Sequence, residues 1–547
     1  MAKRGVLIVL AAAQFLMVLD QAVMNVAISQ LVADFHTTVT TIQAVIAFYA
    51  LVMAALMLTG GKLGDLLGRR RAFRIGTVIY ACGSALTAAS WNVASLAIGW
   101  SVLEGIGAAL VLPAMVALVA SSYQGQPRAV AYGVLGGVAG AGIAVGPILG
   151  GWATTELSWR VVFAGEVVVS LGILLGSRMI PEPPRTGERG RLDWFGSVLS
   201  ALALGLTVVG VLEASNWGWL RPKNSPVEPF GFSLTPFVIA AGALLLWAFG
   251  AWERHREQGG HDVLLHLRLL GSRMMRSGLA TMLAQNLVLM GIFFTVPLFL
   301  QIVQGLDALE TGVRMLPASA GLFVSAIAGS ALAKRYAAKP LVRIGLAIVF
   351  LATLLLLGTI EPELDNASFL VAMGVLGIGM GLVVSQLGNV VQSAVDDRDR
   401  SEAGGLQFTA QQLGSSLGTA FLGAVVITGL IAAFTANIAN DPKISDHVES
   451  QVHERLASGA SFVASSQVRA GAEAAHINRA TTDALVSHYE DAQLEALKLA
   501  LLFAALLVLA SFAATRHLPS RRFEELEAER GPPAEPAPLS EAVAEGV

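Results

Sequence analysis

Three carboxyl side chains stand inside long apolar segments of this sequence: Asp20, Glu104 and Glu166. An ionised side chain at the centre of a bilayer costs about 3 kcal/mol on insertion scales, so carboxyls that persist there usually face a cavity and do chemistry. Burial raises a carboxyl pKa, so such a group can hold a proton at neutral pH and release it when water reaches it. These residues could therefore couple a process to proton movement, and we expect Glu104 to take part, alone or together with Asp20.

Each carboxyl also has a purely structural interpretation. Asp20 could be a hydrogen-bond hub. Glu104 could be held neutral by Trp100 and Ser101, which lie on the same face of a helix. Glu166 could pair with Arg160 near the end of its segment, and for Glu166 this structural interpretation is the favoured one.

The composition places these carboxyls in a membrane protein. Hydrophobic residues make up 54% of the 547 residues and charged residues only 14%, about half the charged content of ordinary globular domains. A formal net charge of −3 and the lack of a basic patch with aromatic residues give no reason to expect nucleic acid as a partner. The single cysteine, Cys82, can form no intramolecular disulfide and is expected to be a small buried residue.

Apolar runs of about 20 residues, the length that crosses a bilayer, occur fourteen times. The N-terminal run is too long for a signal peptide and contains Asp20, so it is taken as the first span. The predicted spans are 6–28, 43–61, 73–91, 95–120, 129–152, 161–180, 194–214, 233–252, 277–301, 311–333, 341–360, 367–391, 404–434 and 495–515.

Lysine and arginine concentrate on one side of this arrangement. The densest clusters are Lys62 with Arg69 to Arg74, then Arg185 to Arg191, then Arg254 to Arg276, and in a fourteen-span chain all three lie on the same side. By the positive-inside rule that side is cytoplasmic. An even number of spans then places both termini in the cytoplasm.

The chain also repeats itself. Arg128 to Gly133, followed by Gly142 and Gly146, recurs as Arg400 to Gly405, followed by Gly414 and Gly418. A duplicated six-helix unit explains the repeat and leaves two inserted helices between the halves, an arrangement in which substrate binds between the halves near the midplane. The predicted division is an N-terminal bundle at 1–180, a linker with two inserted helices at 181–276, a C-terminal bundle at 277–515 that includes an extracytoplasmic loop at 435–494, and a disordered cytoplasmic tail at 516–547.

Two glycine-rich motifs have a spacing that suits a gating loop and a closely packed helix. The run from Gly61 to Arg71 joins spans 2 and 3, and its glycines allow helix ends to approach while a carboxylate pairs with an arginine, as in a gate. The gating residues predicted there are Gly61, Asp65, Gly68, Arg69 and Arg70. In span 5 the glycines four residues apart share one helix face, which permits close packing, and the proline bends the helix. That motif consists of Gly142, Gly146, Pro147, Gly150 and Gly151.

The first run resembles the signature loop of the major facilitator superfamily, although Leu66 stands where that signature usually carries Arg. The Gly-Pro-x-x-Gly-Gly ending at 146–151 resembles the antiporter motif of its exporters. Leu19 to Ile28 is similar to the first-span signature of the fourteen-span drug:proton antiporter family, which Trp159-Arg160, Asp193-Trp194 and 404–414 also resemble. Where relatives commonly have Arg and Gln in span 4, this chain has Ser101 and Glu104.

The resemblance implies an all-α major facilitator fold with two six-helix bundles and two linker helices, in the cytoplasmic (inner) membrane of a bacterium. It implies a monomeric exporter that exchanges a small molecule for protons across the lipid bilayer, powered by the proton gradient, with no cofactor, metal or ATP. Since the only embedded charges are negative, the substrate is expected to be a lipophilic cation. The resemblance also places a sixth helix outside the cavity, which again favours a structural role for Glu166.

Polar amides are expected to supply contacts to the substrate, because the second half has no embedded carboxylate: at the repeat partner of Glu104 stands Leu376. Such amides also often pair with one another inside a membrane. The candidate cavity residues are Asn25, Ser101, Gln285, Asn286, Gln386, Asn389, Gln407 and Gln411.

Three other functions stay open. The exporter could carry a neutral lipid, a peptide or a specialised metabolite. A membrane enzyme is disfavoured because the sequence shows no metal-ligand cluster of His, Asp and Glu, no nucleophile elbow and no phosphate-binding loop. A receptor or scaffold without transport activity could use the extracytoplasmic loop 435–494, but the transport motifs argue against it.

Overall fold

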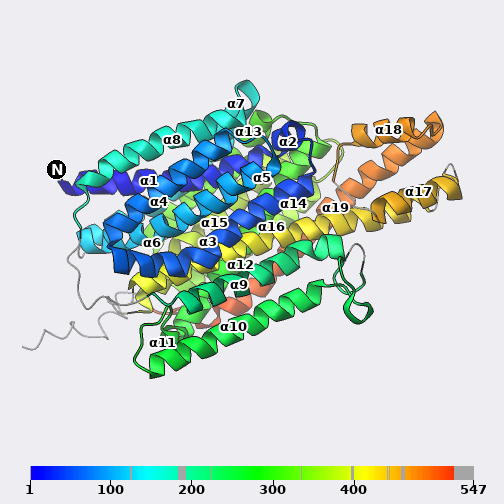
Figure 1. The fold of residues 1–547 in the computed structure, drawn as a ribbon. Helices are drawn as coiled ribbons and strands as arrows, with labels where there is room; N and C mark the ends of the chain where they lie inside the picture. The colour runs from blue at the N-terminus through cyan, green and yellow to red at the C-terminus, as the bar shows by residue number, and fades with distance from the viewer. Residues whose placement is uncertain are drawn as a thin grey trace, which may run out of the picture.

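In the computed structural model the chain is a bundle of long helices that run side by side (Figure 1). The structure describes residues 2–123, 126–182, 192–222, 225–333, 335–395, 400–439, 441–442, 444–457 and 462–522. Most of the predicted cytoplasmic tail therefore lies outside the described residues.

The first half of the chain forms eight α-helices and one π-helical stretch. Thr38 and Asn92 cap two of them, because each side-chain oxygen accepts a hydrogen bond from a backbone N–H of the first turn. The helices are α1 (Ala2–Val26), α2 (Ile28–Asp34), α3 (Val39–Leu67), α4 (Arg69–Ala88), α5 (Val93–Leu96), a π-helix (Ala97–Glu104), α6 (Gly105–Ser122), α7 (Gln126–Glu156) and α8 (Trp159–Gly176).

The rest of the chain is also helical. Asp307 caps α13 in a reciprocal capping box with Glu310, which fixes where that helix begins. The helices are α9 (Trp194–Trp217), α10 (Thr235–Gln258), α11 (Leu267–Gly271), α12 (Arg273–Leu298), a π-helix (Phe299–Val303), α13 (Ala308–Leu332), α14 (Ala338–Thr359), α15 (Asn366–Ser393), α16 (Arg400–Ile438), α17 (Asp446–Ala457), α18 (Ser465–Ala474) and α19 (Arg479–Ala514).

Twelve helical segments of the described chain are long and apolar enough to cross a membrane. Every one of the fourteen predicted spans falls on a helix. The two spans that do not meet the criterion are those on α4 and α7. In α4 the reason is visible, since its first two turns carry four arginines, Arg69 to Arg71 and Arg74.

The two halves pack by the same helix pairs. In the first half α1 packs on α7, α3 and α4 pack on α6, and α4 packs on α8. In the second half the helices at the same positions do the same: α12 packs on α16, α13 and α14 pack on α15, and α14 packs on α19. This repetition of contacts matches the repetition of the sequence.

Two helix pairs make the most extensive contacts between the halves: α3 packs on α16, and α7 packs on α13. At the first pair Gln43 donates to the Thr419 carbonyl (2.8 Å) and Ser416 donates to the Ala47 carbonyl (2.9 Å). Gln301 also joins the halves, because its amide accepts from the Ser29 N–H and donates to the Val26 carbonyl. The bundles are thus tied by side-chain-to-backbone bonds.

The inserted helices α9 and α10 pack on each other, and α9 lies against both α3 and α16. Asp193 holds this pair together. Its carboxylate caps α9 at the Gly196 N–H, accepts from the Trp252 indole (2.7 Å) and pairs with Arg256 (3.3 Å), both on α10. The predicted Asp193-Trp194 motif is therefore a clamp between the two inserted helices.

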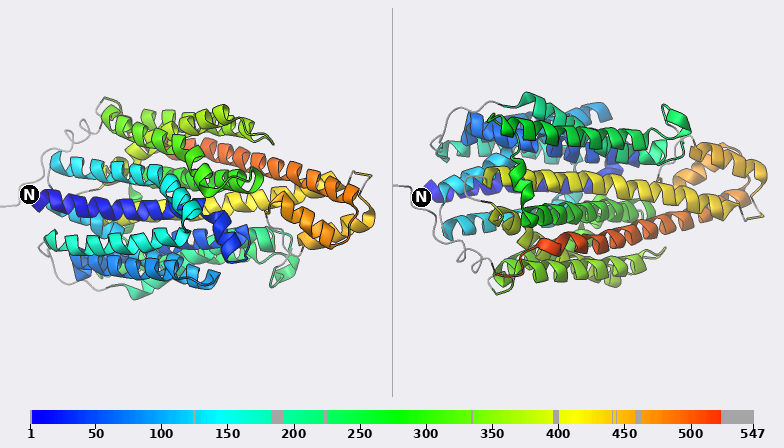
Figure 2. Two further views of the ribbon diagram at one scale, coloured as in Figure 1. Left: turned by 90° about the horizontal axis from the view of Figure 1, so that it is seen from above. Right: turned by 90° about the horizontal axis from the view of Figure 1, so that it is seen from below.

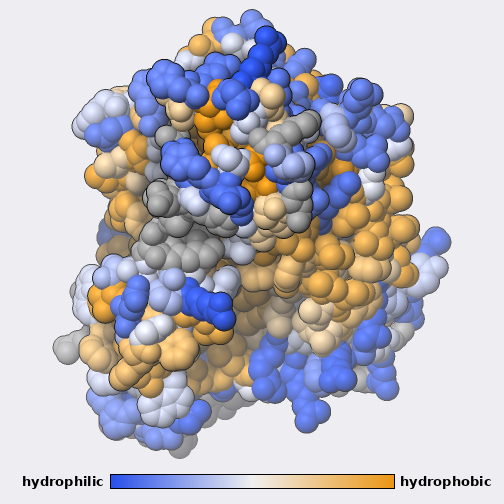
Figure 3. Space-filling model, turned by 90° about the vertical axis from the view of Figure 1, so that its right-hand side faces the viewer, coloured by the Kyte–Doolittle hydropathy of each residue, from blue (hydrophilic) through white to orange (hydrophobic). Residues whose placement is uncertain are grey.

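The bundle has two distinct ends (Figure 2). The N-terminus and the end of α19 lie at one of them, here called the terminal end. At the opposite, lobe end, α16 and α19 extend past the bundle and carry α17 and α18, the lobe. Figure 3 looks onto the lobe end and shows hydrophilic side chains over much of the lobe and apolar side chains along the bundle flank. The loop predicted at 435–494 contains α17, α18 and the start of α19.

Two local expectations were wrong. The predicted loop that begins at Gly61 is helical through Leu67, and the turn is a single residue, Gly68, whose φ of 101° is one that glycine adopts readily. Cys82 is exposed rather than buried, because it stands on the outward side of α4. A small apolar residue costs nothing when it faces lipid.

The segment between α10 and α11 is held by two carboxylates at the terminal end. Glu253 of α10 accepts from the N–H groups of Leu264 (2.9 Å) and Leu265 (3.3 Å). Glu402 of α16 accepts from the His266 backbone N–H, and its other oxygen lies 2.8 Å from His266 Nδ1. The inserted pair is thereby tied to the second half.

The His266 contact predicts a pH dependence. The hydrogen bond to Glu402 raises the pKa of His266 above its usual 6.5. The contact therefore stabilises the fold fully below about pH 6.5, and this stabilisation is lost as the pH rises through the higher folded-state pKa. Hydrogen exchange at 264–271, corrected for its intrinsic pH dependence, should speed up over that window. In the Glu402→Gln variant this pH dependence should disappear, and its persistence would contradict the assignment.

Candidate functional site

The three predicted carboxyls lie together. One oxygen each of Asp20, Glu104 and Glu166 lies within 4.8 Å of the other two, although the residues belong to α1, the first π-helix and α8. Asp20 and Glu104 are completely buried and Glu166 is 2% exposed. We call these three residues the carboxylate triad.

Asp20 is held by aromatic side chains. The Trp100 indole N–H donates to Asp20 Oδ1 (2.7 Å), and the Trp100 ring stacks on Tyr49 with centroids 4.4 Å apart. Trp100 therefore orients Asp20 and does not hold Glu104, which was the role expected for it. The Tyr49 hydroxyl is buried and has no hydrogen-bond partner.

Glu104 is placed by an irregular stretch of helix. It is the last residue of the π-helix Ala97–Glu104, and such insertions re-aim side chains and are frequent at functional sites. Thr87 of α4 donates to its Oε1 (3.1 Å). Ser101 donates instead to the Val45 carbonyl (2.9 Å), so it supports α3 and not the carboxyl.

Glu166 belongs to the same site, contrary to the interpretation favoured from the sequence. Tyr80 and Ser84 of α4 donate to its Oε2 at 3.3 and 3.2 Å. Arg160 does not pair with it, because the guanidinium lies 3.0 Å from Asp34 at the lobe end. Nearly two turns of α8 separate Arg160 from Glu166.

The electrostatics of the triad are unusual for a buried site. Each carboxyl keeps one oxygen that is buried and without a hydrogen-bond partner: Asp20 Oδ2, Glu104 Oε2 and Glu166 Oε1. The bonds that they accept in the described chain come from Trp, Tyr, Ser and Thr, and none comes from a cationic side chain. Oxygen donors so close together can hold a proton or a hard cation, and the buried environment penalises the fully ionised state.

Close helix packing positions Glu104 beneath α4. A Cβ on Gly83 of α4 would lie 2.6 Å from Glu104 Cγ and 2.8 Å from the Gly99 carbonyl oxygen. These distances are shorter than real contacts, so only glycine lets the two helices approach this closely. The sequence offered no sign of the role of Gly83.

The Gly83→Ala variant should therefore be destabilised by about 1–3 kcal/mol, because overpacking forces α4 away from the π-helix. Thermal unfolding of the purified protein in detergent would measure the change. Gly172→Ala on α8 is a matched control, since nothing lies within 4 Å of a Cβ there. Equal unfolding temperatures for both variants would contradict the packing argument.

The glycine motif of α7 packs directly on α1. Cβ atoms on Gly142, Gly146 and Gly150 would lie 3.0, 2.3 and 2.9 Å from Val18, Ala22 and Val23, the residues that flank Asp20. Gly151 is also buried, and the side chain of Pro147 lies outside what the structure describes. The predicted close-packing face is therefore the surface against which α1 positions Asp20.

The predicted gating residues lie at the terminal end. A Cβ on Gly61 would lie 3.7 Å from Pro113 Cβ of α6, and Arg69 NH1 donates to the Ala117 carbonyl (3.3 Å). The side chain of Asp65 is outside the described part of the chain, so its predicted pairing with Arg69 is not tested. Arg70 donates to the Arg178 carbonyl (3.3 Å), which ties α4 to the end of α8.

A family model for the Major Facilitator Superfamily matches residues 10–419, most of the chain and all of the elements that build the triad. The chain belongs to this superfamily. It is a multi-pass membrane transporter, and its similarity to known proteins extends over both halves.

Its relatives are resistance and efflux proteins of bacteria. Puromycin resistance protein pur8 of Streptomyces alboniger is 31% identical over 82% of this chain and 86% of its own length. The tetracenomycin C resistance and export protein of Streptomyces glaucescens is 28% identical over 83% of this chain and 82% of its own. Multidrug efflux pump LfrA of Mycolicibacterium smegmatis is 30% identical over 77% and 80%. The drug-efflux family predicted from the motifs is confirmed.

Solved structures confirm the all-helical major facilitator fold. A bacterial homolog of the human lysosomal transporter Spinster, in an inward-facing and unoccupied conformation, matches with a TM-score of 0.56 at 16% identity, covering 94% of this chain and 97% of that one. A D-xylose-proton symporter matches with a TM-score of 0.54 at 13% identity, covering 77% and 90%. At these identities the likeness concerns the fold alone.

The predicted cavity amides of this transporter do not form one cluster. Asn286 donates to Gln285 Oε1 (3.2 Å), and Gln386 donates to the Gly329 carbonyl (2.9 Å) between α15 and α13. Asn25 donates to the Gln21 carbonyl of its own helix (2.7 Å). The other predicted candidates are Asn389, which is exposed, and Gln407 and Gln411, which are half-buried. Among the amides, the Gln285 amide nitrogen is buried without a partner and is the strongest substrate-binding candidate.

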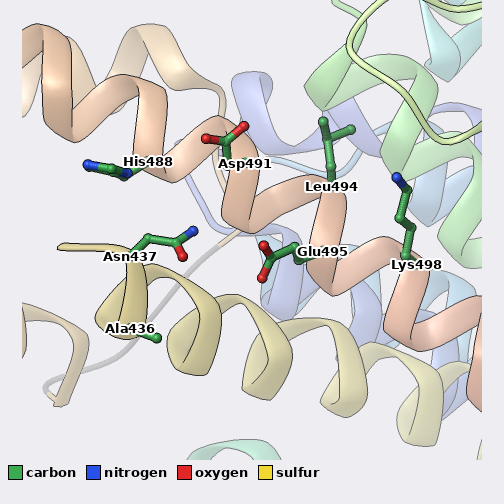
Figure 4. A pocket seen from close by; sticks show the side chains of 7 residues that line it. All are labelled: Ala436, Asn437, His488, Asp491, Leu494, Glu495 and Lys498. Carbon is green, nitrogen blue, oxygen red and sulfur yellow. The ribbon is translucent and has the colours of Figure 1, made fainter. Parts of the chain in front are cut away.

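A polar cavity of about 510 Å³ lies at the lobe end, between α16 and α19 (Figure 4). Its side chains come from the last turn of α16 and the middle of α19. They are Ala436, Asn437, His488, Asp491, Leu494, Glu495 and Lys498. His488 is fixed at its rim by Asp441 (2.8 Å).

Most of the residues that surround the triad were not predicted from the sequence: Tyr49, Tyr80, Ser84 and Thr87. The three α4 residues follow one face at spacings of four and three, and α4 is a helix with few charges beyond its first two turns. That stripe of hydroxyl groups in a membrane helix was a signal that could have placed α4 beside the carboxyls.

Proposed function

We propose that this protein is a secondary active exporter that exchanges protons for a lipophilic, cationic small molecule. The observation that carries the proposal is the carboxylate triad, three buried carboxyls that accept no hydrogen bond from a cationic side chain in the part of the chain that the structure describes. Three ionised carboxylates at this separation repel one another strongly where little water screens them. Protons, or the positive charge of a substrate, relieve that repulsion.

The triad supports exchange rather than co-transport on this reasoning. With protons bound, the triad is neutral and needs no counter-ion, whereas after proton release a cation nearby is favoured. Protons and a cationic substrate therefore compete for the same negative charge. That competition is the physical basis of antiport, and a proton gradient directed inward then drives the substrate outward.

The proposal includes the arrangement in the membrane. We infer fourteen spans, two six-helix bundles at 1–180 and 277–515, and an inserted pair within 181–276. The repeated packing of the halves supports this division. With the basic terminal end in the cytoplasm of a bacterium, both termini are cytoplasmic and the lobe of 435–494 is extracytoplasmic. The transporter is proposed to act as a monomer.

A second candidate function concerns the substrate. Relatives include the probable actinorhodin transporter of Streptomyces coelicolor as well as the tetracenomycin C resistance and export protein. Their names favour export of a specialised metabolite, which need not be cationic. A neutral substrate would use amide contacts such as Gln285, and the triad would then bind protons alone.

The test is dye transport in everted membrane vesicles that contain the full-length protein. Ethidium should enter the vesicles when a proton gradient, acid inside, is imposed, and its uptake should stop when nigericin collapses that gradient. Uptake that is insensitive to nigericin would contradict proton coupling. A sodium gradient serves as a parallel arm, because oxygen donors also fit Na⁺; uptake driven by sodium alone would replace the proton in the proposal.

A further inference from the structure

We propose that the terminal end of α4 binds the headgroup of an anionic phospholipid. The site is a cavity of about 370 Å³ lined by Arg70, Arg71, Arg74 and Glu182. Three cationic side chains face one carboxylate, so the cavity carries a net positive charge. A phosphate group is the ligand that this charge and the forked geometry of arginine recognise.

The arginines are free to bind a ligand. The Nε of Arg70 is buried and has no hydrogen-bond partner, although one of its terminal nitrogens donates to the Arg178 carbonyl. A buried donor without an acceptor costs free energy, which an incoming phosphate oxygen would recover. Arg71 and Arg74 are exposed on the outer side of α4, one helical turn apart, and can turn toward the same anion.

The backbone adds to the attraction. The turn at Gly68 starts α4 at Arg69, so all three arginines stand in the first two turns of a 20-residue helix. The N-terminal end of a helix carries a partial positive charge, which favours an anion. Helix, side chains and unpaired donor thus point to one type of ligand.

The apolar surface next to the cavity distinguishes a lipid from free phosphate. Ile75 and Val78 continue the arginine face of α4 and are 45% and 47% exposed. On α8, which packs beside α4, Leu171 and Leu175 are 52% and 63% exposed. A phospholipid whose phosphate lies at the arginines would lay its acyl chains along these residues, whereas inorganic phosphate would leave them uncovered.

A lipid at this site would lie beside the predicted gating residues. Arg70 belongs to that set, and its bond to Arg178 already joins α4 to the end of α8. A lipid phosphate shared by Arg70, Arg71 and Arg74 would strengthen this junction. The inference does not depend on which ion or substrate is transported.

Native mass spectrometry of the full-length protein in detergent tests the proposal with two probes, dioleoyl-phosphatidylglycerol and dioleoyl-phosphatidylcholine. Phosphatidylglycerol should bind at least about tenfold more tightly, and R71Q/R74Q should remove most of this preference, since each cation near an anionic surface contributes about fivefold. R71K/R74K should keep a large part of it. Unfolding temperatures close to that of the unmodified protein show that the variants are folded.

The matched control is R273Q/R276Q, which removes two exposed arginines with the same spacing from the first turn of α12; these two arginines do not line the cavity at α4. It should leave the preference unchanged. If both double variants lost the preference for phosphatidylglycerol equally, or if R71Q/R74Q kept it, the assignment of the site to these arginines would be wrong. Displacement of phosphatidylglycerol by millimolar inorganic phosphate, with I75N/V78N binding the lipid normally, would identify a free-anion site and overturn the lipid.

Discussion

Asp20→Asn should abolish gradient-driven efflux and reduce dye transport to the level of vesicles without the protein. The amide can still accept the Trp100 hydrogen bond (2.7 Å), so the helix contact persists while the exchangeable proton is lost. Because Asp20 lies within 4.8 Å of both other carboxyls, its neutralisation also removes the charge repulsion that makes those two carboxyls bind protons. Proton release on substrate addition, followed with a pH dye in proteoliposomes, should vanish as well.

Asp34→Asn is the matched control for this experiment. Asp34 also accepts from a tryptophan indole, that of Trp159 (2.8 Å), and pairs with Arg160, but it lies partly exposed at the lobe end. Its substitution removes the same charge and should leave most transport intact. If Asp20→Asn transports dye as the unmodified protein does, the triad is not the coupling site. If both variants lose transport equally, the effect is a general one on folding or insertion.

Glu104→Gln and Glu166→Gln separate the roles within the triad. Each leaves two carboxyls, so partial transport with an altered pH profile is expected rather than complete loss. Glu166 has two hydroxyl donors and Glu104 one, so Glu104 depends less on fixed partners and should show the greater effect. Identical, unaltered pH profiles in both variants would leave Asp20 as the sole coupling group.

The helices and the residue types of this site could be predicted from the sequence more readily than the contacts between its residues. Charged residues are rare in apolar spans, so Asp20, Glu104 and Glu166 could be selected without any structure. Their meeting could not be predicted, because it depends on the crossing of α1, the π-helix and α8. The π-helix adds a residue to a turn and rotates Glu104 in a way that a regular helical projection does not reproduce.

Hydrogen-bond and ion-pair partners were predicted least well for side chains that could reach more than one carboxylate. Arg160 could reach either Glu166 or Asp34, and Trp100 either Glu104 or Asp20; in both cases spacing along one helix suggested the partner that the tertiary packing did not choose. Similarly, the glycines of α7 indicated close packing but not the helix they pack on. A helical pattern defines a face, and only the arrangement of the bundle decides what that face contacts.

The α7 glycines provide the second large effect. Gly146→Ala should reduce transport about 10- to 100-fold, because a displacement near 1 Å at a reacting group has effects of that size. The new Cβ would lie 2.3 Å from the Cβ of Ala22, so α1 and α7 must separate. Ala22 is two residues from Asp20, and the separation would stretch the bond between Asp20 and Trp100. Uptake of ethidium into everted vesicles with matched protein content measures the loss.

The compensating variant makes this prediction specific. Ala22→Gly removes the very atom that Gly146→Ala would strike, so the double variant should recover most of the transport that Gly146→Ala loses. Gly136→Ala, on the same helix where nothing lies within 4 Å of a Cβ, should have little effect. If any alanine in α7 impaired the helix, transport would fall in Gly146→Ala, in the double variant and in Gly136→Ala alike. Recovery in the double variant would instead show that the close approach of α7 to α1 positions the carboxylate on which coupling depends.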